Sequence, residues 1–508
     1  MATILSVVSS ASNYYRILRL SMICKDLRKG RISSCCSIPL QKHRLTGRIS
    51  QRRLQLLPHL FCMDEAGADS SLVNQFSDGG ASSGGSPCGH SSREPEEEFK
   101  SQTVGGDVKE QGKKLVAENA STMNLISPLY HSSIFQWHHF PRRFGEGILV
   151  TAVLFTVLIS TVVIVDSHIW RVIRKPLAPF FLTRPFCMSA VISSYLGWFF
   201  VPLLDWVKAH QVFRTEGPQD HFTKVGTATM GGLFFIPVGI GVARFSTGKS
   251  VELWGVCATT LAFATIGLLD DGLTIWRKHN YGMPGWFKFL LQVAVGSAFV
   301  FWLNGASLSS PYKMKCLVPL LPPFGLWYLG NWYLPLTAFC FAAMSNGVNL
   351  TDGLDGLAAG TSAATYIGMA VAVLPIYPDL GIFGASMAGA CIGFLVHNRY
   401  KAKVFMGDTG SLALGGGLAA MAACSGMFFP LFIASGIFVI ETVSVIAQVS
   451  YFKLTKRLEG KGRRLLRMSP FHHHLELLGW TEPAIAAAAY IVAYILAILA
   501  AYIGLISA

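Results

Sequence analysis

Two short clusters of carboxylates stand at the edges of uncharged segments of the chain. Asp270 and Asp271 are expected to end a helix formed by an apolar run. The helix dipole is negative there and adjacent carboxylates repel each other, so the pair costs stability unless a cation lies nearby. The stretch NGVNLTDGLDGLAAG, residues 346–360, follows a segment from Leu317 to Thr351 that carries no charge. Carboxylates in such places indicate a magnesium site or acid–base chemistry. A solvated helix end is the plain alternative for the paired aspartates.

The polar side chains of the second cluster recur every three residues, at Asn346, Asn349, Asp352 and Asp355. On a helix this spacing brings neighbours together, although the stripe drifts round the axis. Helix through Gly353 and Gly356 is unfavourable, so we expect a helix to end here, with the glycines letting the backbone approach a ligand that the amides and carboxylates bind. A plain turn would need only one or two of these residues.

The stretch MGDTGS, residues 406–411, places Asp408 between glycines just before another predicted helix. Free backbone N–H groups would then converge with a carboxylate at a helix N-terminus, which suits a phosphate with its metal. A simple N-cap is the alternative. Asn398, at the end of the preceding predicted helix, adds a neutral ligand to the same face.

Three consecutive histidines, His472, His473 and His474, follow the arginine-rich stretch 463–467. Neighbouring side chains on a helix point about 100° apart and no cysteine lies near, so hydrogen bonding to phosphate or sugar is favoured over zinc binding. Glu441 is a lone acid in an apolar run, a functional candidate to which the sequence assigns no role. Together these groups fit the handling of a diphosphate with Mg²⁺, where catalysis is mostly positioning and charge neutralisation.

The elements that must position these groups are membrane helices. Of the 508 residues 52% are apolar and 14% charged, and the apolar residues form uncharged blocks about twenty residues long, enough to cross a bilayer. We therefore predict an all-α polytopic integral membrane protein with about ten transmembrane helices. The block from Thr409 to Ile440 is too long for one helix, and we divide it at residues 424–427. The predicted helices begin near Phe186, Thr229, Leu253, Phe289, Leu326, Leu357, Leu380, Gly410, Met427 and Ala484.

The loops that follow the odd-numbered predicted helices hold sixteen Lys and Arg residues against four in the opposite loops, which places the richer loops on the cytoplasmic side or its organellar equivalent. The same loops hold nearly all the polar motifs, so one face of the membrane is chemically equipped. A further apolar run, residues 147–165, is long enough to span as an extra N-terminal helix. If it spans, the basic residues that follow it lie opposite the equipped face, which conflicts with the charge rule. Those residues are Arg171, Arg174, Lys175 and Arg184.

The N-terminal region differs from the rest in composition. Residues 1–60 combine many Lys, Arg and Ser with a single acid, Asp26, which is typical of an organelle transit peptide and, with its Ser-rich start, favours a plastid. Residues 61–140 contain an acidic, Gly- and Ser-rich stretch, typical of a disordered linker. Residues 141–185 would hold the extra helix and a connector, and residues 186–508 the transmembrane enzyme domain. The basic excess borders apolar spans, so it does not indicate nucleic-acid binding.

Five stretches closely resemble the motifs of the phospho-N-acetylmuramoyl-pentapeptide transferase family: GPQDHFTKVGTATMGG, GLLDDGLTIWRKHNYG, NGVNLTDGLDGLAAG, VFMGDTGSLALGGGLA and RMSPFHHHLELLGWTEP. The resemblance covers roughly residues 186–508. It implies an Mg²⁺-dependent transfer of phospho-MurNAc-pentapeptide from UDP-MurNAc-pentapeptide to a polyprenyl phosphate lipid in the membrane. UMP would be released, and lipid I of peptidoglycan synthesis would be formed. The PFHHHLEL form resembles the MurNAc branch of the wider family.

The resemblance also implies roles for the matching residues. Asp270 and Asp271 match the paired aspartates, of which Asp270 would deprotonate or orient the lipid phosphate, and Asp408 matches the magnesium ligand. Lys224 matches a basic residue at the nucleotide pocket. The loop that holds uridine and diphosphate is matched by Asn346, Asn349, Asp352 and Asp355. The sugar-side histidines are matched by His472, His473 and His474.

Two positions depart from the family pattern. Thr274 stands where the family usually has Lys, and the basic residue expected later in that loop falls on Trp286, with Lys288 two residues on. Arg277 and Lys278 are candidates to supply the missing charge. Weakened nucleotide binding is the other consequence.

Several interpretations stay open from sequence. The sister reaction transfers N-acetylglucosamine-1-phosphate with the same aspartate motifs. A proton-coupled carrier would also place acids in a polytopic protein, but here the acids lie at helix ends on one face. A catalytically silent relative is the third alternative. The transit peptide implies a plastid membrane, with the inner envelope expected and the site facing the stroma. Neither the choice between direct attack and a covalent intermediate nor the oligomeric state, for which a homodimer is one option, follows from the sequence.

Overall fold

The computed structural model describes residues 145–173, 177–207, 209, 224, 226–277, 282–306, 317–320 and 324–507. The predicted transit peptide and linker, residues 1–60 and 61–140, lie outside the described residues, as do Arg174, Lys175 and Lys278. The described chain is helical apart from two short strands, β1 (Leu317–Pro319) and β2 (Leu326–Tyr328), which pair antiparallel, and the 3-10 helix η2 (Gly330–Trp332).

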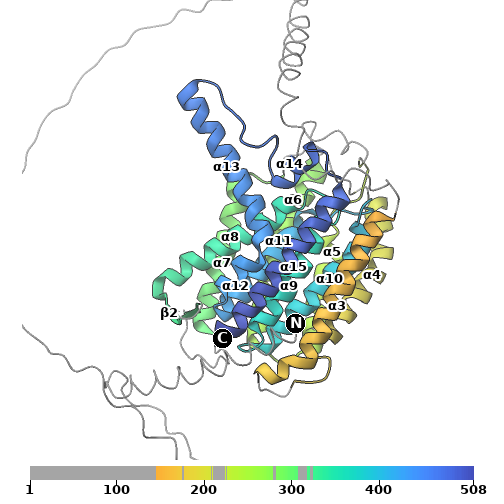
Figure 1. Cartoon of the computed structure of the whole chain (residues 1–508), viewed down its shortest axis with the longest axis vertical. Helices are drawn as coiled ribbons and strands as arrows, with labels where there is room; N and C mark the ends of the chain where they lie inside the picture. The colour runs from red at the N-terminus through yellow and green to blue at the C-terminus, as the bar shows by residue number, and fades with distance from the viewer. Residues whose placement is uncertain are drawn as a thin grey trace, which may run out of the picture. The chain divides into compact units, whose positions relative to one another are not determined.

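The α-helices of the described chain pack together as a bundle (Figure 1). Their bounds are α3 (Glu146–Ile173), α4 (Thr183–Trp206), α5 (Gly232–Ser246), α6 (Val251–Arg277), α7 (Gly285–Gly305), α8 (Tyr333–Thr351), α9 (Leu357–Val373), α10 (Pro378–Asn398), α11 (Gly407–Ser425), α12 (Phe428–Ala434), α13 (Gly436–Glu459), α14 (Phe471–Leu477) and α15 (Glu482–Ser507).

Seven helices of the described chain are long and apolar enough to cross a membrane: α3, α4, α6, α7, α10, α13 and α15. The predicted all-α polytopic membrane class is thereby confirmed. One predicted start is wrong, because the span expected from Leu326 begins as helix only at Tyr333, after β2 and η2. An uncharged run indicates apolar surroundings, but it does not distinguish a strand from a helix. The division after Ser425 is confirmed, and a second break at Ser435 separates α12 from α13.

The centre of the bundle consists of α9 and α11, in which small residues dominate and nearly every side chain is buried. A Cβ on Gly368 of α9 would come within 2.8 Å of Ala497 on α15, and one on Gly415 of α11 would come within 2.4 Å of the Met344 carbonyl on α8. Small residues let helix backbones approach closely, which is how helices pack where no water drives them together. This tight centre fixes the helix ends that carry the polar motifs.

The predicted extra helix, α3, belongs to the same bundle. Leu158 and Val162 are buried, and the Thr161 hydroxyl lies 2.7 Å from the Tyr494 hydroxyl of α15. The Asp166 carboxylate accepts from the Thr183 N–H at 2.8 Å and from the Thr183 hydroxyl at 2.7 Å, so it caps α4.

The direction of α3 follows from its two ends. Gly147, near its start, lies against the Tyr400 carbonyl in the loop after α10, while Asp166, near its other end, contacts Thr183. Arg184 therefore lies at the end of the bundle away from the α10–α11 loop, where the charge rule did not expect it.

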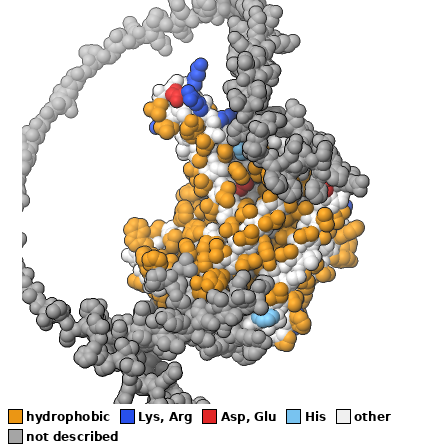
Figure 2. Space-filling view, viewed as in Figure 1, with side chains coloured by type: hydrophobic (Ala, Val, Ile, Leu, Met, Phe, Trp, Pro, Cys, Tyr) orange, Lys and Arg blue, Asp and Glu red, His pale blue; other side chains and the backbone are white. Residues whose placement is uncertain are grey.

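The outer surface of the bundle is apolar. Exposed aromatic and aliphatic side chains cover α4, α7 and α13, as expected for helices that face lipid (Figure 2). Beyond the apolar part of α13, the exposed side chains become basic, with Lys453, Lys456, Arg457, Lys461 and Arg463 at its free end. This is the change from hydrocarbon to a charged interface that a membrane helix requires.

Candidate active site

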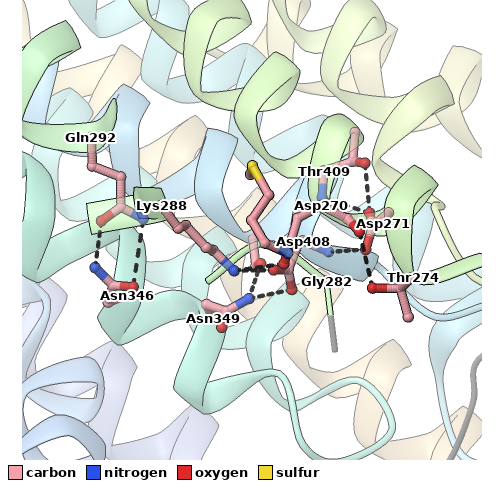
Figure 3. A network of polar contacts seen from close by, with 12 residues as sticks. Asp270, Asp271, Thr274, Gly282, Lys288, Gln292, Asn346, Asn349, Asp408 and Thr409 are labelled. Atoms are coloured by element: carbon pink, nitrogen blue, oxygen red, sulfur yellow. Dashed lines mark hydrogen bonds and ion pairs between the residues drawn. The ribbon is translucent and has the colours of Figure 1, made fainter. Parts of the chain in front are cut away.

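We expected Asp270 and Asp271 to end their helix, but both residues lie within α6. The helix continues past both aspartates to Arg277. Neighbouring side chains on a helix diverge by about 100°. The two aspartates therefore face different partners (Figure 3).

Asp271 holds the first turn of α11. Its carboxylate accepts from the Asp408 N–H at 3.0 Å, from the Thr409 N–H at 2.9 Å and from the Thr409 hydroxyl at 2.6 Å. The backbone N–H groups that we expected to be free for a phosphate are thus occupied by a carboxylate from another helix. Gly407 permits the close approach, since it has φ of +72° and a Cβ there would meet Asp271 Oδ2. The effect is to fix the position of Asp408.

Asp270 and Asp408 meet around a lysine. Lys288, in the first turn of α7, donates to Asp270 Oδ2 at 3.0 Å and to Asp408 Oδ2 (Figure 3). The Met283 N–H also donates to Asp270 Oδ1, and the Asn349 amide donates to Asp408 Oδ1 at 2.6 Å. One ammonium between two carboxylates in a partly buried place stabilises both charges. The site is thus assembled from α6, α7, α8 and α11.

The departures from the family pattern are explained in part by this arrangement. Trp286, at the position where the family has a basic residue, is 71% exposed. Lys288, two residues further along the chain, makes the contact with both aspartates. Thr274 donates its hydroxyl to the Asp270 carbonyl at 3.0 Å and brings no charge. Arg277 is exposed and donates to the Gly282 carbonyl, so its side chain is directed along the same loop.

The remaining residues of the NGVNLTDGLDG motif divide between two environments. Asn346 pairs with Gln292 of α7, donating to its side-chain oxygen at 2.6 Å, and Gln292 is fully buried (Figure 3). The helix ends at Thr351, as predicted. Asn349 therefore faces Asp408, whereas Asp352 and Asp355 lie in the turn that leads to α9.

Asp355 is buried against Lys224, whose ammonium lies 2.8 Å from Asp355 Oδ1. The same ammonium lies 2.7 Å from Oε2 of Glu482, the first residue of α15. Burial lowers the pKa of Lys224, but the carboxylates of Glu482 and Asp355 overcome this effect and leave the pKa raised, so Lys224 is charged. Sequence reasoning missed Glu482, whose only signal was its place in the WTEP stretch.

Asn398 fixes the turn that carries these acids. Its side-chain oxygen accepts from the Gly356 N–H at 3.1 Å and its amide donates to the Val404 carbonyl at 2.8 Å. Gly356 has φ of +80°, a conformation that favours glycine. Asn398 thus joins the α8–α9 turn to the α10–α11 loop.

Asp352 is the acid of this turn with the most perturbed titration. Burial raises the pKa of its carboxyl to about 8, and the nearby carboxylates of Asp408, Asp271 and Asp355 act in the same direction. At neutral pH the group is therefore mostly protonated and can donate a hydrogen bond as well as accept one.

The three histidines point to different partners, as their spacing predicted. His472 is buried with Nδ1 3.3 Å from Glu441 Oε2, His473 Nδ1 lies 2.6 Å from Glu476, and His474 Nδ1 accepts from the Arg467 N–H at 3.3 Å. Glu441 also accepts from the Phe471 N–H at 2.7 Å. Glu441, the lone acid of α13, therefore holds the start of the short helix α14. His472 lies beside Gly353, where an added Cβ would meet the Nε2 atom of His472.

The donor set fits a magnesium ion. Mg²⁺ prefers oxygen ligands and is usually bound by one or two carboxylates together with water and substrate phosphate oxygens. Asp270 and Asp408 lie close enough together to share the Lys288 ammonium, so two carboxylate ligands that favour a cation converge here. Among the described residues no group of three or more His, Cys, Asp or Glu side chains is arranged to hold a metal ion.

Comparison with known proteins gives consistent matches. Residues 253–426, which include Asp270 and Asp408, match a family model described as glycosyl transferase family 4. A phospho-N-acetylmuramoyl-pentapeptide-transferase of Trichormus variabilis is 45% identical over 330 residues, 65% of this chain and 89% of that protein. A protein of the same name from Nostoc punctiforme is 44% identical over 354 residues, 69% of this chain and 95% of that protein. Because the similarity extends over nearly the whole length of these relatives, the chain belongs to the phospho-N-acetylmuramoyl-pentapeptide-transferase family of phosphoglycosyl transferases.

Proposed function

We propose that the protein transfers phospho-MurNAc-pentapeptide from its UDP carrier to a polyprenyl phosphate, releasing UMP and forming lipid I. The observation that carries this proposal is the meeting of Asp270 and Asp408 around Lys288 at one end of a membrane helix bundle. A water-soluble nucleotide and a lipid phosphate can come together only where helix ends reach the interface. The names of the relatives support the choice of reaction.

The site residues take the following roles. Asp408 is the magnesium ligand with Asp270 beside it, and the bound ion would neutralise the diphosphate and the developing charge on the leaving phosphate. Asp271 positions Asp408 through the first turn of α11. Asn349 holds the other oxygen of Asp408. Asp270 orients the lipid phosphate or accepts its proton.

The reaction proceeds by direct attack. An oxygen of the lipid phosphate forms a bond to the sugar-bearing phosphorus, the bond from that phosphorus to the UMP oxygen breaks, and UMP leaves with the electron pair. A covalent aspartyl intermediate is less favourable because Asp270 and Asp408 both accept from Lys288, whose positive charge lowers the nucleophilicity of their oxygens.

The other polar groups at this end of the bundle bind the substrates. The nucleotide side comprises Lys224, Asn346, Asn349, Asp352, Asp355 and Asn398, and the sugar side His472, His473 and His474. Lys224 and Asp355 already contact each other, and Asp352 lies in the same turn. The UDP-sugar and the polyprenyl phosphate would thus be bound at the same end of the bundle.

The protein acts in a plastid membrane, with the inner envelope and a stromal active site as the expected placement. The Ser-rich, basic segment 1–60 has transit-peptide composition, and the relatives come from cyanobacteria such as Nostoc punctiforme. Import of a tagged full-length chain into isolated plastids, followed by membrane fractionation, tests this placement.

The experiment for the reaction is UMP release by the purified full chain in detergent, with polyprenyl phosphate, Mg²⁺ and UDP-MurNAc-pentapeptide. A parallel reaction contains UDP-GlcNAc in place of the MurNAc nucleotide. UMP release with the MurNAc substrate alone is expected, together with a lipid product of matching mass. Release with UDP-GlcNAc alone would move the chain to the sister reaction, and no release with either would remove the proposal.

A further inference from the structure

Glu482 belongs to the Lys224 cluster, and the proposed roles do not account for it. It begins α15, after the GlyTrpThr turn, and its side chain is 10% exposed. A carboxylate in the first turn of a helix lies at the positive end of the helix dipole, so this position favours its charge. The question is what this buried acid does beside Lys224.

Glu482 makes two contacts with groups assigned to nucleotide binding. Its Oε2 accepts from the Lys224 ammonium at 2.7 Å and from the Asp355 backbone N–H at 3.4 Å. Asp355 in turn accepts from Lys224 through Oδ1 and from the Ala402 N–H through Oδ2 at 2.9 Å. One acid at the start of α15 thus fixes both a lysine before α5 and the α8–α9 turn.

A lysine side chain has several freely rotating bonds and three ammonium donors. Asp355 alone would leave Lys224 free to rotate about a single contact. With Glu482, two of its donors are directed to fixed acceptors, and within the described part of the chain the third is left for a ligand; the Lys224 side chain is 13% exposed. The second carboxylate therefore determines where the remaining donor points.

We propose that Glu482 is a positioning residue for nucleotide binding, which holds Lys224 and Asp355 in the geometry that receives the nucleotide of the UDP-sugar. This inference rests on the proposed function. Glu482 does not contact Asp270 or Asp408 through any interaction in the described chain, so its role is in binding and not in the chemical step.

The test compares Glu482→Gln with the wild type in the full-length protein. Glutamine keeps the size and loses the charge, so Lys224 is held less firmly. We expect the KM for the UDP-sugar and the Kd for UMP, measured by calorimetry, to rise about tenfold, with kcat and the KM for polyprenyl phosphate within about twofold. Glu482→Asp keeps a carboxylate at the same helix start and should recover part of the affinity.

Glu459→Gln is the matched control, because Glu459 also forms an ion pair, with Arg463, but at an exposed position on α13. It should leave the Kd for UMP unchanged. An unchanged Kd in a folded Glu482→Gln protein would overturn the proposal, as would a loss confined to kcat. If Glu482→Gln does not fold, equal UMP affinity for Glu482→Asp and the wild type overturns it, whereas weaker binding supports it. Absence of UMP binding and turnover in the wild type would instead remove the proposed function.

Discussion

Lys288, from a third helix, offsets one of the two negative charges that Asp270 of α6 and Asp408 of α11 bring together. A diphosphate brings further negative charge to this place, so one ammonium does not suffice when substrate binds. A divalent cation held by Asp408 would restore the balance. The charge that the site needs thus follows from the residues already present.

Asp408 is the residue whose loss should cost most. In Asp408→Asn the carboxylate charge is removed while the side-chain size and the α11 turn remain, so the diphosphate loses a cation ligand. We expect UMP release to fall about 10²–10³-fold and not to recover with added Mg²⁺. UMP release as a function of Mg²⁺ concentration measures this. Asp379→Asn is the control. Asp379 lies in the first turn of α10, at the opposite end of that helix from Asn398, and the variant should keep turnover.

Asp352 predicts a pH dependence of stability. In the unfolded chain an Asp ionises near pH 4, but in the folded protein burial and three neighbouring acids raise the pKa of Asp352 to about 8. The folded state therefore holds an extra proton between these values, so the stability contributed by the neutral carboxyl is present below about pH 4 and is lost as pH rises through about 8.

Asp352→Asn removes this loss because the amide does not ionise. We expect the variant to raise the thermal unfolding midpoint at pH 8.5 more than at pH 5.0, in protein kept metal-free with a chelator. The measurement is the midpoint of both proteins at both pH values. An equal difference at the two pH values would contradict the assigned pKa.

The helices of the bundle were largely predictable, because long uncharged runs bounded by loops identify membrane spans. Their contacts were not. That Asp271 caps α11 depends on α6 and α11 lying side by side, and no local pattern around Asp271 reports this. The same holds for Glu482, which is ordinary in its own sequence and becomes informative only beside Lys224. Motif spacing therefore identified the carboxylates but not the partners that fix them.

Gly267 controls the distance between α6 and α11. A Cβ there would lie 2.1 Å from the Asp408 carbonyl oxygen and 2.5 Å from the Thr409 nitrogen, so alanine must push the two helices apart. Backbone atoms cannot rotate away as a flexible side chain can. Asp271 would then lose its bonds to the first turn of α11, and Asp408 would be displaced.

Gly267→Ala should therefore destabilise the protein by about 1–3 kcal/mol and reduce UMP release at least tenfold. Gly272→Ala is the matched control, since it lies on the same helix with nothing within 4 Å of the added Cβ. That variant should be neutral or slightly more stable, because alanine is the better helix former. Thermal unfolding and turnover of the two variants are compared, and equal behaviour would refute the packing argument.

The described bundle has an apolar outer surface (Figure 2) and an end where the termini of α7, α8, α11 and α15 bring polar side chains together. Every candidate site residue lies in the described chain from Lys224 onward, and α3 is the first described helix. We divide the chain into residues 1–60, 61–140, 141–185 and 186–508, and truncation can test which of these segments the folded enzyme needs. The first two segments should be dispensable for chemistry, whereas α3 should not be dispensable for stability.

A chain that begins at residue 141 should keep its UMP release within about twofold and its unfolding midpoint, because the bonds that assemble the site remain. A chain that begins at residue 177 loses α3, and with it the buried Leu158 and Val162 and the Thr161 contact with Tyr494. It also loses the Asp166 cap of α4, which by itself is worth about 1 kcal/mol. Its midpoint should fall well below that of Asp166→Ala in the full chain, which isolates the cap. If both truncations behaved like the full chain, α3 would be an attachment to the bundle and not a part of it.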